Sequence, residues 1–234
     1  MHPAAFLDRD DTIIRRKNNL PTGDLGDPDD IELIPGAAEA LTRLRNAGYH
    51  LVVFTNQGGV ARGRYTEHDV NRVHHRLDQL LLAAGVPPST HPEPARAAPV
   101  RTPDGRTEPA PPVAIDAYRF CPYHPRGALP AYTREHPWRK PAPGMLLDAI
   151  ATLRLDPAKS IAIGDQPRDL EAATAAGVPR GRCRLLAAAG PSSRPAPHHP
   201  WPAAPSVTAA APDLSAPSAS TGRTTTHAGC CDSK

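Results

Sequence analysis

Short apolar runs alternate with longer segments of helical periodicity along most of this chain. The runs, whose length and apolar content predict buried parallel strands, lie at 4–7, 50–54, 117–120, 160–163 and 182–187. Apolar side chains recur at helical spacing within 36–47, 66–85, 143–153 and 170–176. Strands that alternate with helices in this way predict an α/β fold with a doubly wound parallel sheet.

Local signals support the predicted helices. Thr66, with Asp69 three residues later, is a capping box that predicts the start of one helix. Pro143 stands at a predicted first helical position, where proline is favoured. On the helix that begins near Thr66, His74 and His75 are expected to lie on the outer, exposed face.

Proline is concentrated in two places. Many of the thirty prolines fall between residues 87 and 113 or beyond about residue 190. Segments of this composition have few periodic apolar positions from which to build a core. We therefore predict one folded unit over 1–188, interrupted by a proline-rich insertion loop at 87–113, and a disordered tail at 189–234. A tail that binds a partner is the alternative. Apart from the insertion, only 13–30 is added, so no large cap domain is expected.

The charge is modest. A formal net charge of +3 with scattered basic residues argues against a nucleic-acid or membrane surface. No apolar run is long enough to cross a bilayer, and the first strand begins too early to leave room for a signal peptide. The cysteines show no spacing typical of a disulfide framework. We expect a cytoplasmic protein and a monomer.

Polar residues follow three of the predicted strands. Asp8 and Asp10 follow the first, Thr55 the second and Asp165 the fourth. Because the carboxyl ends of parallel strands meet at one edge of a sheet, these residues are expected to share a site. Asp8 and Asp10 point the same way, and two carboxylates so close need a cation or a proton between them. Magnesium prefers carboxylates and phosphate oxygens, which predicts Mg²⁺ at Asp8 and Asp165.

Together with Lys140, these residues have the chemistry of phosphoryl transfer. One oxygen of Asp8 would attack phosphorus and form an aspartyl phosphate. Asp10 would protonate the leaving alcohol and later activate water, help of a kind worth about 10²–10⁴-fold. Thr55 and Lys140 would stabilise the phosphoryl oxygens. Asp169 is expected to orient Lys140 or a metal-bound water rather than to bind metal directly.

Four stretches, 6–10, 55–63, 139–145 and 164–165, resemble the haloacid dehalogenase (HAD) superfamily. Within it they are similar to the D-glycero-D-manno-heptose 1,7-bisphosphate 7-phosphatases, mostly through 55–57 followed by 61–63. The resemblance implies a HAD-like, Rossmann-type fold, a phosphorylated sugar as substrate, and Mg²⁺ held by Asp8, Asp165 and the carbonyl of Asp10. It also implies that substrate is bound by motif residues, namely Arg9, Asn56, Gln57, Arg62 and Arg139.

Three alternatives remain. Histidinol-phosphate phosphatases share every catalytic residue and differ in how the leaving group is held. A nucleic-acid 3′-phosphatase of the same fold would need a basic stripe that is absent from this sequence. A catalytically silent, phosphate-binding relative would commonly have lost one of the catalytic or metal residues, which here are all present, Asp8, Asp10, Thr55, Lys140 and Asp165.

The second phosphate of a bisphosphate needs a cationic partner. Arg62 and Arg139 are candidates for it. The cluster at 15–17 is another, although adjacent cations of this kind are more often a solvated loop.

Two residues depart from the pattern of the family. Asp11 stands where glycine is usual, so the turn after Asp10 loses backbone freedom. Because aspartate tolerates unusual backbone angles, we expect strain rather than inactivation. Gln166 stands where many relatives have lysine, and it is expected to alter contacts near the metal.

The structural zinc loop of many relatives is incomplete in this chain. Its four ligand positions are occupied by Cys121, Tyr123, His136 and Trp138. His124 could join Cys121 and His136, but a tetrahedral structural site wants four nitrogen or sulfur ligands. We expect this loop to pack through Tyr123 and Trp138 without zinc.

Overall fold

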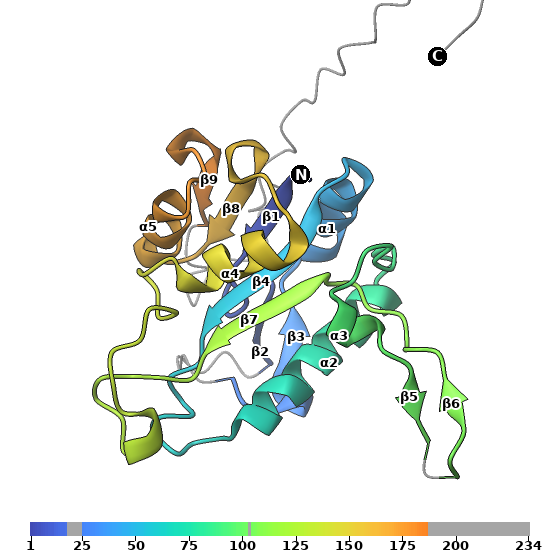
Figure 1. Ribbon diagram of the computed structural model, residues 1–234, viewed down its shortest axis with the longest axis horizontal. Helices are drawn as coiled ribbons and strands as arrows, with labels where there is room; N and C mark the ends of the chain where they lie inside the picture. The colour runs from blue at the N-terminus through green and yellow to red at the C-terminus, as the bar shows by residue number, and fades with distance from the viewer. Residues whose placement is uncertain (18–24, 103, 187–234) are drawn as a thin grey trace, which may run out of the picture.

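The computed structural model describes residues 1–17, 25–102 and 104–186. Its centre is a five-stranded parallel sheet (Figure 1). The strands stand in the order β7 (Ala117–Cys121), β4 (His50–Asn56), β1 (Ala4–Leu7), β8 (Ile161–Gly164) and β9 (Cys183–Leu185). The predicted α/β fold is confirmed. The predicted tail at 189–234 lies outside the described residues.

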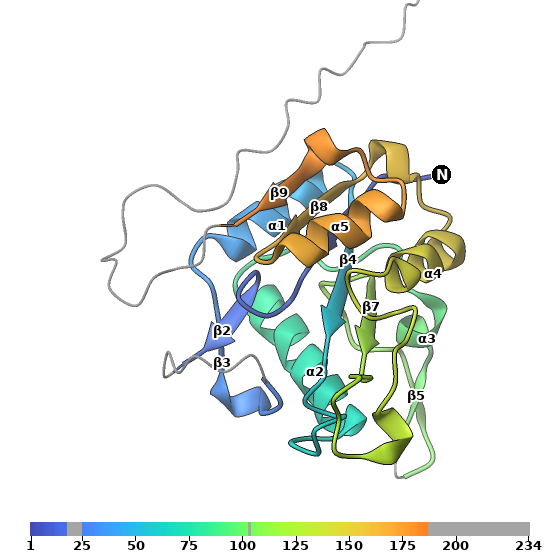
Figure 2. The ribbon, with the colours of Figure 1, turned by 90° about the vertical axis from the view of Figure 1, so that its left-hand side faces the viewer.

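Helices cover both faces of this sheet, as Figure 2 shows. α1 (Ala37–Asn46) and α2 (Glu67–Ala83) bury their apolar sides against one face, together with Leu7 and Val53. α4 (Gly144–Leu153) and α5 (Pro167–Ala175) pack against the other face, together with Phe6 and Phe54. Successive strand residues therefore enter different cores, which explains why the strands read as continuous apolar runs.

The order of the strands reverses at β1. β4 and β7 lie on one side of β1, and β8 and β9 lie on the other. The backbone N–H of Asp8 donates to the carbonyl of Ile163 at 2.9 Å, so β1 and β8 stay paired up to their carboxyl ends. In open α/β sheets ligands bind in the crevice at such a reversal. The reversal therefore makes the carboxyl ends of β1 and β8 the expected place for a ligand.

A two-stranded antiparallel hairpin follows the first motif. It pairs β2 (Ile14–Arg16) with β3 (Ile31–Leu33). Arg15 and Glu32 form an ion pair of 2.7 Å, and Arg16 and Asp30 one of 2.8 Å. Arg15 and Arg16 of the cluster at 15–17 therefore lie in a strand and are paired with carboxylates, whereas the expectation was a solvated loop; Lys17 follows the strand and donates to the carbonyl of Asp29.

The predicted insertion loop contains regular structure. It forms the short helix α3 (Pro94–Ala97) and a hairpin of β5 (Val100–Arg101) with β6 (Thr107–Glu108). Glu93, just before α3, pairs with Arg119 of β7 at 2.6 Å. The base of the insertion is therefore tied to the edge of the sheet, and the proline-rich insertion contains short regular elements that the sequence did not predict.

Two local predictions along the helices need correction. His74 is 3% exposed and stacks on Tyr118 of β7, with ring centroids 4.1 Å apart, so it belongs to the inner face of α2. His75 is exposed as expected. Pro143 caps α4, which begins one residue later than predicted. The capping box of Thr66 and Asp69 is confirmed. In the described part of the chain, no helix is long and apolar enough to span a membrane.

Candidate active site

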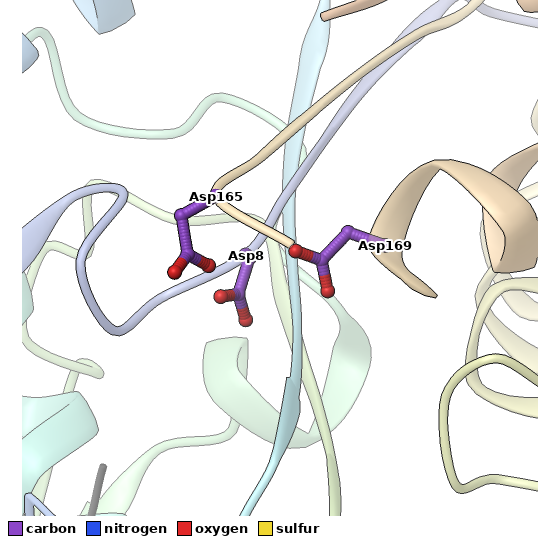
Figure 3. A group of neighbouring side chains, drawn as sticks. All are labelled: Asp8, Asp165 and Asp169. Carbon is purple, nitrogen blue, oxygen red and sulfur yellow. The ribbon is translucent and has the colours of Figure 1, made fainter. Parts of the chain in front are cut away.

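Three carboxylates meet at the carboxyl ends of β1 and β8. Asp8 follows β1, Asp165 follows β8, and Asp169 lies in the first turn of α5. Figure 3 shows the three side chains pointing toward one another. One oxygen of each lies within 4.8 Å of the others, which makes this the group of acids able to hold a metal ion among the described residues. A side chain at position 164 would collide with Asp169, because a Cβ there would lie 2.4 Å from Asp169 Oδ2.

Lys140 is the cation of this cluster. Its Nζ lies 2.6 Å from Asp8 Oδ1 and 2.7 Å from Asp169 Oδ1, and it also donates to the carbonyl of Phe54 at 3.1 Å. The ammonium is buried. Burial alone would lower the pKa of Lys140, but Asp8 and Asp169 raise it above its usual value. Lys140 therefore remains charged between the two acids.

One ammonium does not balance the acids around it. Burial raises the pKa of Asp8 to about 8, and the neighbouring charges of Asp169 and Asp10 act in the same direction against Lys140. Burial also raises the pKa of Asp11, and Asp165 and Asp10 reinforce that rise. The sequence did not mark Asp11 as part of this charge. Such an excess of carboxylate suits a divalent cation that takes oxygen ligands, such as Mg²⁺.

The acids of this cluster differ in the groups that they contact. Asp8 and Asp165 come together as the metal prediction requires. Asp169 is engaged twice, because Lys140 occupies one oxygen and the N–H of Gln166 donates to the other at 2.9 Å. This geometry agrees with the expectation that Asp169 orients Lys140. The carboxylate of Asp10 faces Arg9 rather than the other acids, with 2.7 Å between Arg9 Nε and Asp10 Oδ1.

Three residues predicted to bind substrate contact the predicted catalytic residues. Arg9 is fully buried and Gln57 is 1% exposed. Both side chains donate to the carboxylate of Asp10. Asn56 bonds to the backbone of Lys140 in both directions, at 3.0 and 3.2 Å. Each of these three side chains contacts a predicted catalytic residue. Their assignment to substrate binding stays a prediction.

Arg62 and Arg139 lie near each other, and Arg139 directly precedes Lys140 in the chain. A Cβ on Gly58 would lie 3.1 Å from both Arg62 Nη1 and the ring of His124. Arg139 donates to the carbonyl of Tyr123 at 3.2 Å. Burial lowers the pKa of Arg139, and the nearby charges of Arg168 and Arg62 lower it further. Mutual repulsion among these cations marks a place where an anion is favourable.

The two departures from the family pattern have visible consequences. Asp11 adopts φ 56°, in the left-handed region where glycine is preferred. The expected strain after Asp10 is therefore located at one residue. Gln166 donates from Nε2 to Asp165 Oδ2 at 2.8 Å, so it does contact a predicted metal ligand.

The four positions of the incomplete zinc loop lie close in space. The rings of Tyr123 and His136 stack with centroids 4.3 Å apart, and His136 meets Trp138 edge-on at 6.3 Å. The thiol of Cys121 donates to the carbonyl of Tyr123 at 3.9 Å. Ring packing of this kind is what the prediction of a metal-free loop requires. The absence of zinc itself stays a prediction.

Two family models match this chain. A family model described as polynucleotide kinase 3 phosphatase matches residues 3–175. A second model, described as HAD-hydrolase-like, matches residues 137–214. The first spans well over half of the chain.

Two curated relatives have the same printed name. The D-glycero-beta-D-manno-heptose-1,7-bisphosphate 7-phosphatase of Rhodopseudomonas palustris is 39% identical, over 76% of this chain and 81% of the relative. The enzyme of the same name from Escherichia coli K12 is 34% identical, over 75% of each chain.

Solved structures agree with these relatives. A putative HAD-like phosphatase from Mesorhizobium loti is 34% identical and superimposes with a TM-score of 0.59, covering 75% of this chain and 69% of its own. The D,D-heptose 1,7-bisphosphate phosphatase from B. bronchiseptica, complexed with magnesium and phosphate, is 27% identical with a TM-score of 0.53, covering 75% and 76%.

Proposed function

The chain belongs to the HAD superfamily of phosphatases, in the family of the heptose 1,7-bisphosphate 7-phosphatases, and we propose that it removes the 7-phosphate of D-glycero-β-D-manno-heptose 1,7-bisphosphate. The observation that carries the proposal is the convergence of Asp8, Asp165 and Lys140 at the end of β1 and β8. The names of the relatives favour the β anomer. A neighbour that holds magnesium and phosphate favours Mg²⁺ as cofactor.

The reaction proceeds in two transfers on Asp8. The carboxylate oxygen of Asp8 attacks phosphorus, the bond from phosphorus to the sugar oxygen breaks, and Asp10 gives its proton to that oxygen. Asp10 then takes a proton from water, which attacks phosphorus and releases phosphate and the free Asp8 carboxylate. Magnesium held by Asp8 and Asp165, when bound, supplies positive charge that offsets the negative charge of nucleophile and phosphoryl group.

The phosphoryl group is held by Thr55 and Lys140. Gln57 Nε2 donates to Thr55 Oγ1 at 2.8 Å, so the hydroxyl accepts from behind and its own proton is free to point to a phosphoryl oxygen. Lys140 lies 2.6 Å from the nucleophilic carboxylate and so lies close to the oxygens on which charge develops. Fixed donors of this kind lower the barrier because they need no rearrangement during the reaction.

Two arginines near each other would hold the rest of the substrate. Arg62 and Arg139 provide the charge that the remaining phosphate of a bisphosphate needs. This grouping favours a bisphosphate over histidinol phosphate, which carries a single phosphate. The predicted second-phosphate role of the cluster at 15–17 loses support because Arg15 and Arg16 are paired with acids.

One further substrate class has an observation in its favour. The match to the polynucleotide kinase 3 phosphatase model makes a nucleic-acid 3′-phosphate the second candidate. The small, scattered positive charge of the chain favours the sugar phosphate.

The test is phosphate release with and without Mg²⁺ from both heptose bisphosphate anomers, histidinol phosphate and a 3′-phosphorylated oligonucleotide. We expect fast, metal-dependent release from the β anomer and loss of turnover by at least about 10³-fold in Asp8→Asn. A preference for histidinol phosphate or for the oligonucleotide would overturn the substrate but keep the mechanism. Activity that persists in Asp8→Asn would overturn the mechanism, and no release from any ester would identify a silent relative.

A further inference from the structure

A line of hydrogen bonds leads from Tyr65 to the carboxylate of Asp10. The hydroxyl of Tyr65 donates to Gln57 Oε1 at 2.8 Å. The amide nitrogen of Gln57 then donates to Asp10 Oδ2 at 3.0 Å and to Thr55 Oγ1 at 2.8 Å. The tyrosine thus fixes which way the amide faces, because its hydroxyl occupies the oxygen end and leaves the nitrogen end toward Asp10.

Arg9 holds the same carboxylate from the other side. Its Nε donates to Asp10 Oδ1 at 2.7 Å and its Nη2 to Asp10 Oδ2 at 3.2 Å, while Nη2 also donates to the carbonyl of Leu25 at 3.0 Å. The side chain is fully buried, and its Nη1 has no hydrogen-bond partner among the residues that the structure describes. Burying a charge with an unsatisfied nitrogen lowers stability, so this arginine is poorly explained as a stabilising element.

Tyr65 is placed by two glycines. A Cβ on Gly26 would lie 2.3 Å from Tyr65 Cδ1, and a Cβ on Gly59 would lie 2.3 Å from Tyr65 Cε1. No side chain could be added at either position without moving the ring. The segment at 25–26 therefore serves both arms, since the carbonyl of Leu25 binds Arg9 and Gly26 receives Tyr65.

We propose that Arg9, Gln57 and Tyr65 are positioning residues that hold the carboxylate of Asp10 in one orientation for proton transfer. This inference rests on the proposed function, in which Asp10 is the acid and base. None of the three touches the reacting atoms. Two donors from Arg9 and one from Gln57 bind the two oxygens of the carboxylate along fixed directions. A carboxylate free to rotate would spend less time aligned with the leaving oxygen.

The leaving group separates positioning from simple damage. A sugar alkoxide leaves badly and needs the proton of Asp10, whereas p-nitrophenolate leaves well and needs little help. The value of kcat/KM reports steps up to the first transfer to Asp8. Weaker positioning of Asp10 should therefore lower kcat/KM for the heptose bisphosphate and spare kcat/KM for p-nitrophenyl phosphate. Loss of folding or of metal would lower both.

The experiment measures both kcat/KM values for wild type, Tyr65→Phe and Gln57→Met. Tyr65→Phe keeps the ring between its glycines and removes the hydrogen bond to Gln57, so we expect a loss of about 3- to 10-fold on the sugar ester only. Gln57→Met keeps the length of the side chain and removes both donors, so we expect about 10²-fold on the sugar ester and a smaller loss, through Thr55, on the aryl ester. Tyr49→Phe is the matched control, because that buried hydroxyl accepts from Arg182 at 2.9 Å, at the end of β4 opposite the site.

The outcomes are distinct. Equal losses on both esters in Tyr65→Phe, or no loss on either, would overturn the positioning role while the wild-type enzyme still hydrolyses the sugar ester. A wild type that hydrolyses p-nitrophenyl phosphate but no alkyl phosphate would overturn the proposed function and this inference with it. A sugar-specific loss in Tyr65→Phe, absent from Tyr49→Phe, is the expected result.

Discussion

Buried aspartates at two places in this molecule have opposite surroundings. Beneath the insertion, Asp116 Oδ2 accepts the N–H of Leu51 at 2.6 Å and Arg45 Nη1 at 2.7 Å. Asp78 accepts two backbone N–H groups, each at 2.9 Å, and pairs with Arg96. Each of these acids has its own arginine and at least one backbone donor. Burial still raises the pKa of Asp78, but Arg96 and the two N–H groups oppose that rise.

At the end of β1 and β8 the balance is missing. Asp8 and Asp169 share the ammonium of Lys140. One oxygen of Asp165 lies within 4.8 Å of an oxygen of each of them, close enough for one metal ion to contact all three. Burial and the neighbouring acids raise the pKa of Asp8 to about 8. Proteins tolerate unbalanced charge of this kind mainly at functional sites. Burial of an acid therefore does not by itself identify a functional site. Buried acids that share one cation, as Asp8 and Asp169 share Lys140, do so better than acids that each have an arginine.

The largest effect on stability is expected at Asp116. Asp116→Ala removes the partner of the partly buried Arg45 and of the buried Leu51 N–H, and breaking this pair should lower the free energy of unfolding by about 3–5 kcal/mol. Urea unfolding at pH 7 measures it, with Asp104→Ala on the exposed hairpin as matched control. A loss below about 1 kcal/mol would remove the distinction between the two sets of acids.

The opposite sign is expected at Asp8. Because its pKa in the folded chain lies near 8, above its usual value of 3.8, the folded state holds a proton that the unfolded state has released. Without metal, this carboxyl lowers stability progressively as pH rises from about 4 to 8. Asp8→Asn should therefore stabilise the metal-free protein at pH 8 by about 1–2 kcal/mol. Equal unfolding free energies for wild type and variant at pH 8, in chelator, would contradict this sign.

A smaller, pH-dependent effect is expected at His74. Burial keeps its pKa well below the usual 6.5, and the charges of Arg9 and Arg96 act in the same direction. Below pH 6.5 the unfolded chain gains a proton that the folded chain does not, so His74 lowers stability as pH falls, by up to about 1.4 kcal/mol per pH unit. His74→Phe, which preserves the stack on Tyr118, should flatten urea-derived stability between pH 6.5 and 5.5. His75→Gln is the exposed control, and parallel curves for wild type and His74→Phe would refute burial of a neutral ring.

The sequence predicted the elements whose signals are local. β1 and β4 are apolar on both faces, and a residue that can bind metal or phosphate follows or ends each of them, so fold and site came from one pattern. Asp11 was identified because an unusual residue type stood in a turn, and its φ of 56° confirms the strain.

What the sequence did not predict depends on the direction of side chains. Arg9 and Gln57 were assigned to substrate by their motif, but the backbone turns them behind Asp10. His74 was placed outside because helical periodicity cannot show that the insertion and β7 widen the buried face of α2. The strands β5 and β6 are two residues each and lie among prolines, too short for any periodic signal.

The smallest effect is expected at the tip of the insertion. Val100 faces Glu108 in antiparallel register and is 48% exposed, so residues 101–107 can be replaced by a short Gly-rich turn that rejoins the two ends. The anchors beneath, Glu93 with Arg119 and Ser89 with Asp116, stay in place. Arg101 and residues 104–107 are exposed, so the replacement should change the free energy of unfolding by less than about 0.5 kcal/mol and leave kcat/KM unchanged. Glu93→Ala removes one acidic partner of the mostly buried Arg119, so it should lower the free energy of unfolding by more. A shortened hairpin that lowers kcat/KM would show instead that the insertion reaches the substrate, and that its acids serve the site as well as the fold.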